Sequence, residues 1–177
     1  SPYRQYASLV ELSLLDGSIT PLVGEPSCFC AVALRAGQLI RLSITSNFTG
    51  FNVDAYDLIG NTEQIIPSSN NLGNYTQGGN ILISPDGQYV IYALSQIELG
   101  SVEASVQTVL MLVNLDNSSQ GQLSSTIMSY VRPIQWTEDN TAVLITMSDM
   151  NGTWKINLLS GELSQISVST FIGTLVI

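Results

Sequence analysis

The feature that most constrains the fold is a repeated pattern of short strands and tight turns. Residues 83–92 and 136–145 share the same order of a strand end, a turn that carries an aspartate, and an apolar strand. A weaker copy without the aspartate occupies residues 33–40, so the copies are 50 to 53 residues apart. Apolar and polar residues alternate in segments such as 39–45, which predicts strands with one buried face.

The second half of each unit repeats as well, as a strand, a turn and a short strand. Four copies are present, at residues 12–19, 55–62, 113–117 and 156–163. Short strands with a repeat of this length predict an all-β fold, a β-propeller of four-stranded antiparallel blades. About four blades are expected: residues 28–68, 78–125 and 131–167, with a partial blade formed by 6–23 and 168–177.

Residues 83–92, with the turn Ser84-Pro85-Asp86-Gly87, followed by the turn at Asp116, resemble the repeat of TolB-type β-propellers, which are similar to WD repeats. Residues 136–145 are a degenerate copy. The resemblance implies the propeller fold and a structural role for Asp86 and Asp139, whose side chains would cap the backbone of their own turns. It implies no particular function.

The expected ring is incomplete. Residues 6–23 supply two outer strands of a blade and residues 168–177 supply its innermost strand, but the strand between them is missing. An unpaired strand edge is a liability for a soluble protein. We therefore expect the ring to be completed by a longer chain or by a second copy in a homodimer. The alternative is a closed four-bladed ring with one thin blade.

The charge of the chain excludes one class of partner. The net charge is −9, from 14 acidic and 5 basic residues. The cations are scattered along the chain, at Arg4, Arg35, Arg41, Arg132 and Lys155. Nucleic-acid binding requires clustered cations, so no nucleic acid is expected as a partner. The longest apolar run, residues 109–113, is far too short for membrane insertion.

The residue types present also limit the chemistry. The chain has no histidine, which excludes a Ser-His-Asp triad and histidine metal ligands within it. Cys28 and Cys30 would share one face of a strand, and a disulfide between them would close a very small ring. We expect two small apolar residues in a buried strand. A strained redox disulfide and a metal-binding thiolate pair are the alternatives, so their redox state stays open.

Carboxylate pairs are the only other chemistry that the sequence suggests. Asp54 and Asp57 should point to opposite faces of one strand. Asp139 and Asp149 flank an apolar strand pair and could approach each other, but a surface hairpin explains them equally well. Residues 149–153 offer two or three oxygen ligands, fewer than calcium needs. No catalytic, cofactor-binding or metal-binding residue is therefore predicted, and no cofactor.

Binding is the remaining expectation. Loops on the flat faces of a propeller carry recognition, and the longer connections are residues 46–51, 68–80 and the polar loop 97–105. Four aromatic residues could line a sugar- or peptide-binding face: Tyr75, Tyr130, Trp136 and Trp154. Trp136 aligns with Ile83, which favours a place in the core.

The sequence thus predicts a non-catalytic propeller that binds a protein partner or supports an assembly, and not an enzyme. One alternative is an accessory propeller of a larger enzyme, such as a prolyl-oligopeptidase-type peptidase, which requires a separate α/β domain. Another is a glycan-binding all-β domain. Residues 1–4 do not resemble a signal peptide. Two features favour an extracytoplasmic or secreted protein. Lysine occurs only once, and the sequence has four Asn-x-Ser/Thr sites, at residues 47, 74, 117 and 151.

Overall fold

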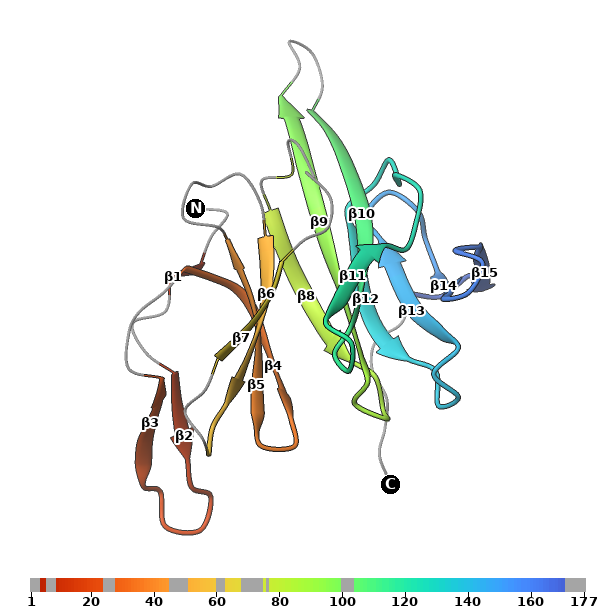
Figure 1. Ribbon diagram of the computed structural model, residues 1–177. Helices are drawn as coiled ribbons and strands as arrows, with labels where there is room; N and C mark the ends of the chain where they lie inside the picture. Colours follow the sequence, from red (N-terminus) through yellow and green to blue (C-terminus); the bar gives the residue numbers. More distant parts are fainter. Residues whose placement is uncertain are drawn as a thin grey trace.

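A computed structural model describes residues 4–5, 9–23, 28–44, 51–59, 63–67, 75, 77–99 and 104–170. Within these residues every regular element is a β-strand, and every strand pair is antiparallel. The strands form three larger sheets and one separate hairpin. The architecture is that of a partial β-propeller whose sheets do not close into a ring (Figure 1).

Three sheets are built as propeller blades, in which consecutive strands are neighbours. We number them from the second, because the separate hairpin stands in the place of a first blade. The second blade contains β4 (Cys28–Arg35), β5 (Gln38–Ile44), β6 (Phe51–Asp57) and β7 (Glu63–Pro67). The third blade contains β8 (Gln77–Ile83), β9 (Tyr89–Leu99), β10 (Ala104–Asn114) and β11 (Ser119–Gln122). The fourth blade contains β12 (Val131–Trp136), β13 (Ala142–Met147), β14 (Thr153–Asn157) and β15 (Leu163–Ser167).

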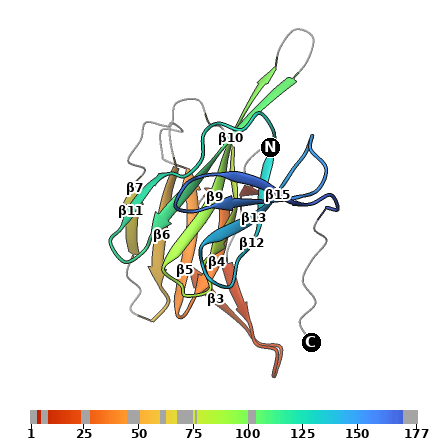
Figure 2. The same ribbon diagram turned by 90° about the vertical axis from the view of Figure 1, so that its right-hand side faces the viewer.

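The blades stack face to face in chain order, as the view from the side of the fourth blade shows (Figure 2). The first strands of successive blades are in contact, β4 with β8 and β8 with β12. These strands therefore lie on the inner side of the arc, as the innermost strands of a propeller do. In each blade the turn between the first and second strands and the turn between the third and fourth strands lie at the same end. We call this end the turn face.

The N-terminal part differs in detail from the expected half-blade. β2 (Leu9–Leu12) and β3 (Ile19–Val23) pair with each other as a two-stranded sheet. A further strand that the sequence pattern did not indicate, β1 (Arg4–Gln5), pairs with β4 and gives the second blade a fifth strand. Residues 171–177 lie outside the described part of the chain, so the pairing expected of residues 168–177 with 6–23 stays a prediction.

Two hydrophobic clusters hold the blades together, one at each junction. The first lies between the second and third blades and includes Leu42, Phe51 and Tyr92. The second lies between the third and fourth blades and includes Ile91 and Ile145. Because the third blade is covered on both sides, β9 is apolar at consecutive positions, as in other sheets buried on both faces. Val90, Ile91, Tyr92 and Leu94 are all fully buried.

Gly78 allows the second and third blades to approach closely. A Cβ atom at this position would lie 2.8 Å from the Phe51 ring and 3.0 Å from Leu42. The register of β8 shifts just beyond it, between Gly79 and Leu82. The glycine-rich segment expected to link these blades thus ends earlier than residue 80, because its last residues already belong to β8.

The polar loop expected at residues 97–105 is strand at both of its ends. β9 extends to Leu99 and β10 begins at Ala104, paired in register from Tyr89–Asn114 to Leu99–Ala104. This hairpin projects beyond the other strands, at the top of Figure 1. Backbone hydrogen bonds of the antiparallel ladder join the two strands along this extension.

Candidate functional site on the turn face

The turns between first and second strands repeat one hydrogen-bond network. In the third blade, Asp86 Oδ1 accepts a hydrogen bond from the Ser84 hydroxyl at 2.5 Å and one from the Gln88 amide at 3.0 Å. In the fourth blade, Asp139 Oδ1 accepts from the Thr137 hydroxyl at 2.6 Å and from the Thr141 amide at 3.1 Å. These bonds are the turn caps that the sequence predicted.

The same bonds explain the acidity of both aspartates. Hydrogen bonds to the ionised form of a carboxylate stabilise that form. The Ser84 hydroxyl, followed by the Gln88 amide, lowers the pKa of Asp86. The Thr137 hydroxyl, followed by the Thr141 amide, lowers the pKa of Asp139. Both carboxylates are therefore charged turn caps, which fits a structural role better than proton transfer.

The turns between third and fourth strands repeat a second network, in which the side chain of the last strand residue caps the turn. Asp57 accepts from the Ile59 amide at 2.8 Å, Asn114 from the Asp116 amide at 2.9 Å, and Asn157 from the Leu159 amide at 2.9 Å. In the β2–β3 hairpin, Ser13 accepts from the Leu15 amide at 3.4 Å. This bond fixes the equivalent residues of the four units without reference to the sequence alignment.

A backbone hydrogen bond joins the two turns of each blade. The amide of the residue after each cap donates to the preceding turn: Leu58 to the Gly37 carbonyl at 3.0 Å, Leu115 to Gln88 at 2.8 Å, and Leu158 to Thr141 at 3.0 Å. The two turns of a blade are thereby held at a fixed distance. The turn face thus consists of turns joined in pairs by hydrogen bonds, which can present side chains in a fixed arrangement.

Large apolar side chains project from three of the four equivalent turn positions. Leu15 is 100% exposed, Ile59 87% and Leu159 98%. The fourth position is occupied by Asp116. Single exposed apolar residues are ordinary on a protein surface, but here they recur at one position of a repeated turn.

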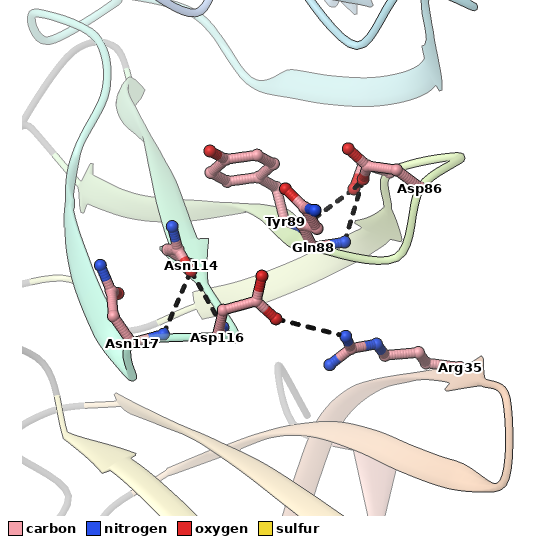
Figure 3. Close-up of polar contacts among 8 residues, drawn as sticks. Arg35, Asp86, Gln88, Tyr89, Asn114, Asp116 and Asn117 are labelled. Carbon is pink, nitrogen blue, oxygen red and sulfur yellow. Dashed lines mark hydrogen bonds and ion pairs between the residues drawn. The ribbon is translucent and has the colours of Figure 1, made fainter.

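Asp116 differs because it has a partner in the neighbouring blade. Arg35, the last residue of β4, forms an ion pair with Asp116 at 3.5 Å (Figure 3). On its way, the Arg35 side chain passes beside Gly87, where an added Cβ would lie 3.3 Å from Nε and 3.6 Å from Cγ. Arg35 therefore covers the junction between the second and third blades on the turn face.

The junction between the third and fourth blades is open at the same end. Two adjoining hollows of about 440 Å³ and 390 Å³ share four residues, Tyr89, Leu112, Leu158 and Leu159. Asn140 and Asn157 line the smaller hollow, and β11 lines the larger one. We call this pair of hollows the interblade groove. All of its lining residues are uncharged.

The carboxylate pairs suggested by the sequence do not form sites. Asp54 and Asp57 have separate roles, as expected of opposite faces: Asp57 caps a turn, whereas Asp54 accepts a hydrogen bond from the Ser43 hydroxyl at 2.6 Å. The expectation that Asp139 and Asp149 approach each other is wrong. They lie before and after β13, a six-residue strand, and are thus separated by roughly 20 Å.

Asp54 belongs to a buried ion pair instead. Its carboxylate lies 3.8 Å from Arg41 Nη2, and both side chains are buried. The Arg41 guanidinium also lies 5.6 Å from the centre of the Tyr56 ring. Burial raises the pKa of Asp54, and the Ser43 hydrogen bond and the Arg41 charge oppose that rise. This pair was not predicted, because residues 41 and 54 meet only through the register of β5 and β6.

The aromatic candidates are distributed over different parts of the fold. Trp136 is buried in the second cluster, as predicted, and its Nε1 donates to the Leu82 carbonyl at 3.3 Å. Trp154 packs against the same cluster, and Tyr75 against the first. Tyr130 is 40% exposed and lies at the opposite end from the turn face, where its hydroxyl contacts Asn80. They do not form one aromatic surface.

Several expectations fall on residues that the structure leaves undescribed. Residues 45–50 and 68–74 lie outside the described part, and so do the side chains of Cys28 and Cys30. Among the residues that are described, no group of three His, Cys, Asp or Glu side chains is placed to hold a metal ion. Within the same residues, no helix has the length and hydropathy needed to span a bilayer.

Comparison with known proteins gives a fold but no family. No protein-family model and no curated protein matches the sequence. Similar solved structures include hydrazine synthase of Kuenenia stuttgartiensis, with a TM-score of 0.63 and 9% identity; an oligogalacturonate lyase in complex with manganese, with a TM-score of 0.60 and 11% identity; and the tricorn protease, with a TM-score of 0.55 and 11% identity.

These matches cover 86%, 90% and 85% of this chain, but 47%, 41% and 16% of the three other chains, respectively. The chain thus spans less than half the length of each structure. The hydrazine synthase and tricorn protease structures contain β-propeller domains. At such low sequence identities the likeness concerns the fold alone: this chain forms part of a β-propeller.

Proposed function

We propose that this chain is a non-catalytic part of a propeller that binds another protein through its turn face. The single observation that carries the proposal is the recurrence of Leu15, Ile59 and Leu159 as exposed side chains at one repeated turn position. Exposing a large apolar side chain to water costs roughly 1.5–3 kcal/mol compared with burying it. A protein partner would recover part of this free energy by covering the three side chains.

The rigidity of the turns supports the same function. Each turn is capped by a side chain and tied to its neighbouring turn by a backbone hydrogen bond. A surface that is already ordered loses little conformational entropy on binding. The turn caps at Asp86 and Asp139 also support the finer assignment of the repeats to the TolB type, which we propose on the resemblance of the sequence.

A second candidate is an accessory propeller of a larger enzyme. The observation that favours it is the partial coverage of the tricorn protease, of which this chain matches 16%. In that case the catalytic groups would lie in another part of the protein. The two candidates are separated by the length of the natural polypeptide and by whether it carries a G-x-S-x-G motif and a histidine.

We also propose an extracytoplasmic location. Asn117 and Asn151, which begin two of the four Asn-x-Ser/Thr sites, are exposed in turns at opposite ends of the blades. Both positions are accessible to a glycosylating enzyme. Treatment of the natural protein with a glycosidase should lower its apparent mass if these sites are used, and an unchanged mass would remove this support.

Affinity capture with matched variants tests the binding proposal. Purified protein carrying Ile59→Asp is compared with wild type and with Met128→Asp, using an extract of the cells in which the protein occurs. Met128 is 61% exposed and lies between β11 and β12, away from the turn face. We expect Ile59→Asp to lose a captured protein that wild type and Met128→Asp retain. Equal capture by all three proteins would contradict the proposal.

A further inference from the structure

The interblade groove lies at the junction between the third and fourth blades. At the equivalent position of the junction between the second and third blades, a side chain of the protein itself covers the surface. The repeated hydrogen bonds of the turn face define which residues are equivalent in the third and fourth blades. Asp86 and Asp139 cap the same turn, which makes Gly87 equivalent to Asn140. Asp116 and Leu159 both follow the cap of the second turn by two residues.

Arg35 is the side chain that covers the junction between the second and third blades. Its stem lies beside Gly87 and its guanidinium pairs with Asp116, so it contacts the residues that correspond to Asn140 and Leu159. The first turn of the second blade is two residues shorter than that of the third, since Arg35 pairs with Gln38 whereas Ser84 pairs with Tyr89. Ser84 is thus the counterpart of Arg35.

Ser84, the counterpart of Arg35, does not reach the corresponding position in the groove. Ser84 is short, buried and engaged, because it donates to Asp86 and accepts from the Tyr89 amide at 2.9 Å. The groove therefore stays open where the previous junction is covered.

The groove lining defines the chemistry of a ligand. Asn140 Oδ1 is buried without a hydrogen-bond partner, so the Asn140 amide group can turn to present this acceptor to the groove without losing a hydrogen bond of Oδ1. Leaving such an acceptor unsatisfied costs about 1–3 kcal/mol, so the site calls for an N–H or O–H donor. Around it, the half-buried side chains of Tyr89, Leu112 and Leu158 offer apolar walls, and the exposed Leu159 lies at the mouth of the groove. Leu159 replaces the aspartate that binds a cation at the earlier junction, so a cationic head group has no counter-charge here.

We propose that the interblade groove binds a peptide segment through one aliphatic side chain, while a backbone N–H of that peptide donates to Asn140 Oδ1. The aliphatic side chain takes the place that the Arg35 stem takes at the preceding junction. This inference rests on the proposed function, since it names the chemistry by which the turn face recognises a protein. It adds a defined pocket and a defined hydrogen bond to that face.

A titration followed by amide NMR tests the inference with small probes. N-acetyl-leucinamide carries the aliphatic side chain and the N–H donor, and N-acetyl-glycinamide carries the donor alone. We expect saturable shifts of the amides of Tyr89, Leu112, Asn140, Leu158 and Leu159 with the leucine probe. A single side chain of this size should bind weakly, with a Kd on the order of millimolar. The glycine probe should produce little change.

Two variants restore the residues of the closed junction, Asn140→Gly and Leu159→Asp. Each should weaken binding of the leucine probe at least about fivefold, the loss of one hydrogen bond or apolar contact. Leu159 is almost fully exposed, so Leu159→Asp should fold normally, and its amide spectrum verifies this. Met128→Asp, at the other end of the blade, should leave the affinity unchanged.

The inference is overturned if both probes shift the same amides equally, or if Leu159→Asp binds the leucine probe as wild type does. Failure of the groove and failure of the turn face are distinguishable. Capture that depends on Ile59, which does not line the groove, together with no binding of the leucine probe would overturn the groove inference and leave the proposed function standing.

Discussion

Arg35 and Asp116 form an ion pair at 3.5 Å across the boundary between the second and third blades, on the turn face. Their side chains are 27% and 55% exposed, so water screens much of their attraction. In a double-mutant cycle with Arg35→Ala and Asp116→Ala, we expect a coupling free energy below about 1 kcal/mol. The coupling should shrink further in 1 M salt.

Arg35→Ala should destabilise the protein more than Asp116→Ala, because it also removes the stem that packs beside Gly87. Urea unfolding of the four proteins in the cycle measures both effects. A coupling of several kcal/mol that is insensitive to salt would show that the pair is buried in solution, contrary to the structure.

The turn aspartates should make the protein sensitive to acid. Hydrogen bonds lower the pKa values of Asp86 and Asp139, and the pKa of Asp16 falls to about 2 through the Ser13 hydroxyl and the Ser18 amide. A carboxylate whose pKa is lower in the folded state stabilises the fold above its unfolded pKa of about 3.9. That contribution is lost as the pH falls from about 4 toward 2.

Unfolding followed between pH 6 and pH 2 should therefore be less steeply pH-dependent for Asp86→Asn than for wild type. Asparagine keeps an acceptor oxygen for the Gln88 amide but has no proton to bind. Glu138→Gln is a suitable control, because it neutralises an exposed carboxylate in the equivalent turn of the fourth blade without touching the capping aspartate Asp139. A steeper acid transition in Asp86→Asn would contradict the assigned role.

Gly152 should be intolerant of a side chain. Its φ is +103°, and a Cβ would overlap the Ser167 carbonyl oxygen and lie 2.6 Å from Gln165 Nε2. Gly152→Ala should cost at least about 1–3 kcal/mol from backbone strain, with the overlap adding to it. Gly121→Ala is the matched control, since a Cβ there meets nothing within 4 Å. Thermal unfolding of both variants checks the contrast, and equal stability would contradict it.

Replacing one member of the buried pair of Arg41 and Asp54 should lower the free energy of unfolding more than replacing both members together. Asp54→Leu leaves the buried Arg41 charge without its carboxylate and should cost about 3–5 kcal/mol. The double variant Arg41→Met/Asp54→Leu should recover most of that loss, because apolar replacements avoid the desolvation of both charges. Urea unfolding distinguishes this from simple additivity, which would indicate that the two side chains do not interact.

The pH dependence of this pair has the opposite sign from that of the turn aspartates. Burial raises the pKa of Asp54 in the folded state. The stability contributed by its protonated form is thus complete below the unfolded pKa of about 3.9 and is lost as the pH rises through the higher folded pKa. Asp54→Leu in the Arg41→Met background should remove this component, which a pH series of unfolding midpoints would detect.

Local patterns made the blades predictable from the sequence. Alternation and turn residues act within a few positions, so the strands of the third and fourth blades and the caps at Asp86 and Asp139 follow directly from them. The extension of β9 and β10 was missed because backbone hydrogen bonds between the two strands leave no periodic pattern of side chains. β1, with two residues, is too short to have a period.

The candidate site could not be predicted from the sequence, for a different reason. Ile59 and Leu159 are recognisable as equivalent only when the turn caps fix the register. The interblade groove depends on which side chain one blade places over the next. The turn after Arg35 is two residues shorter than the turn after Ser84, so an alignment of the repeats without gaps does not place these two residues opposite each other. Contacts between blades, such as Arg35 with Asp116, arise from stacking and leave no periodic signal.

Site-specific photo-crosslinking from the two ends of the blades tests directly whether the turn face binds a protein partner. A benzophenone amino acid is placed at Leu159 on the turn face or at Met128 at the other end, both exposed, and the protein is irradiated in the cells in which it occurs. We predict a discrete protein adduct from position 159 that is absent from position 128. Adducts from position 128 alone, or none from either position, would contradict the claim that the turn face is the binding surface.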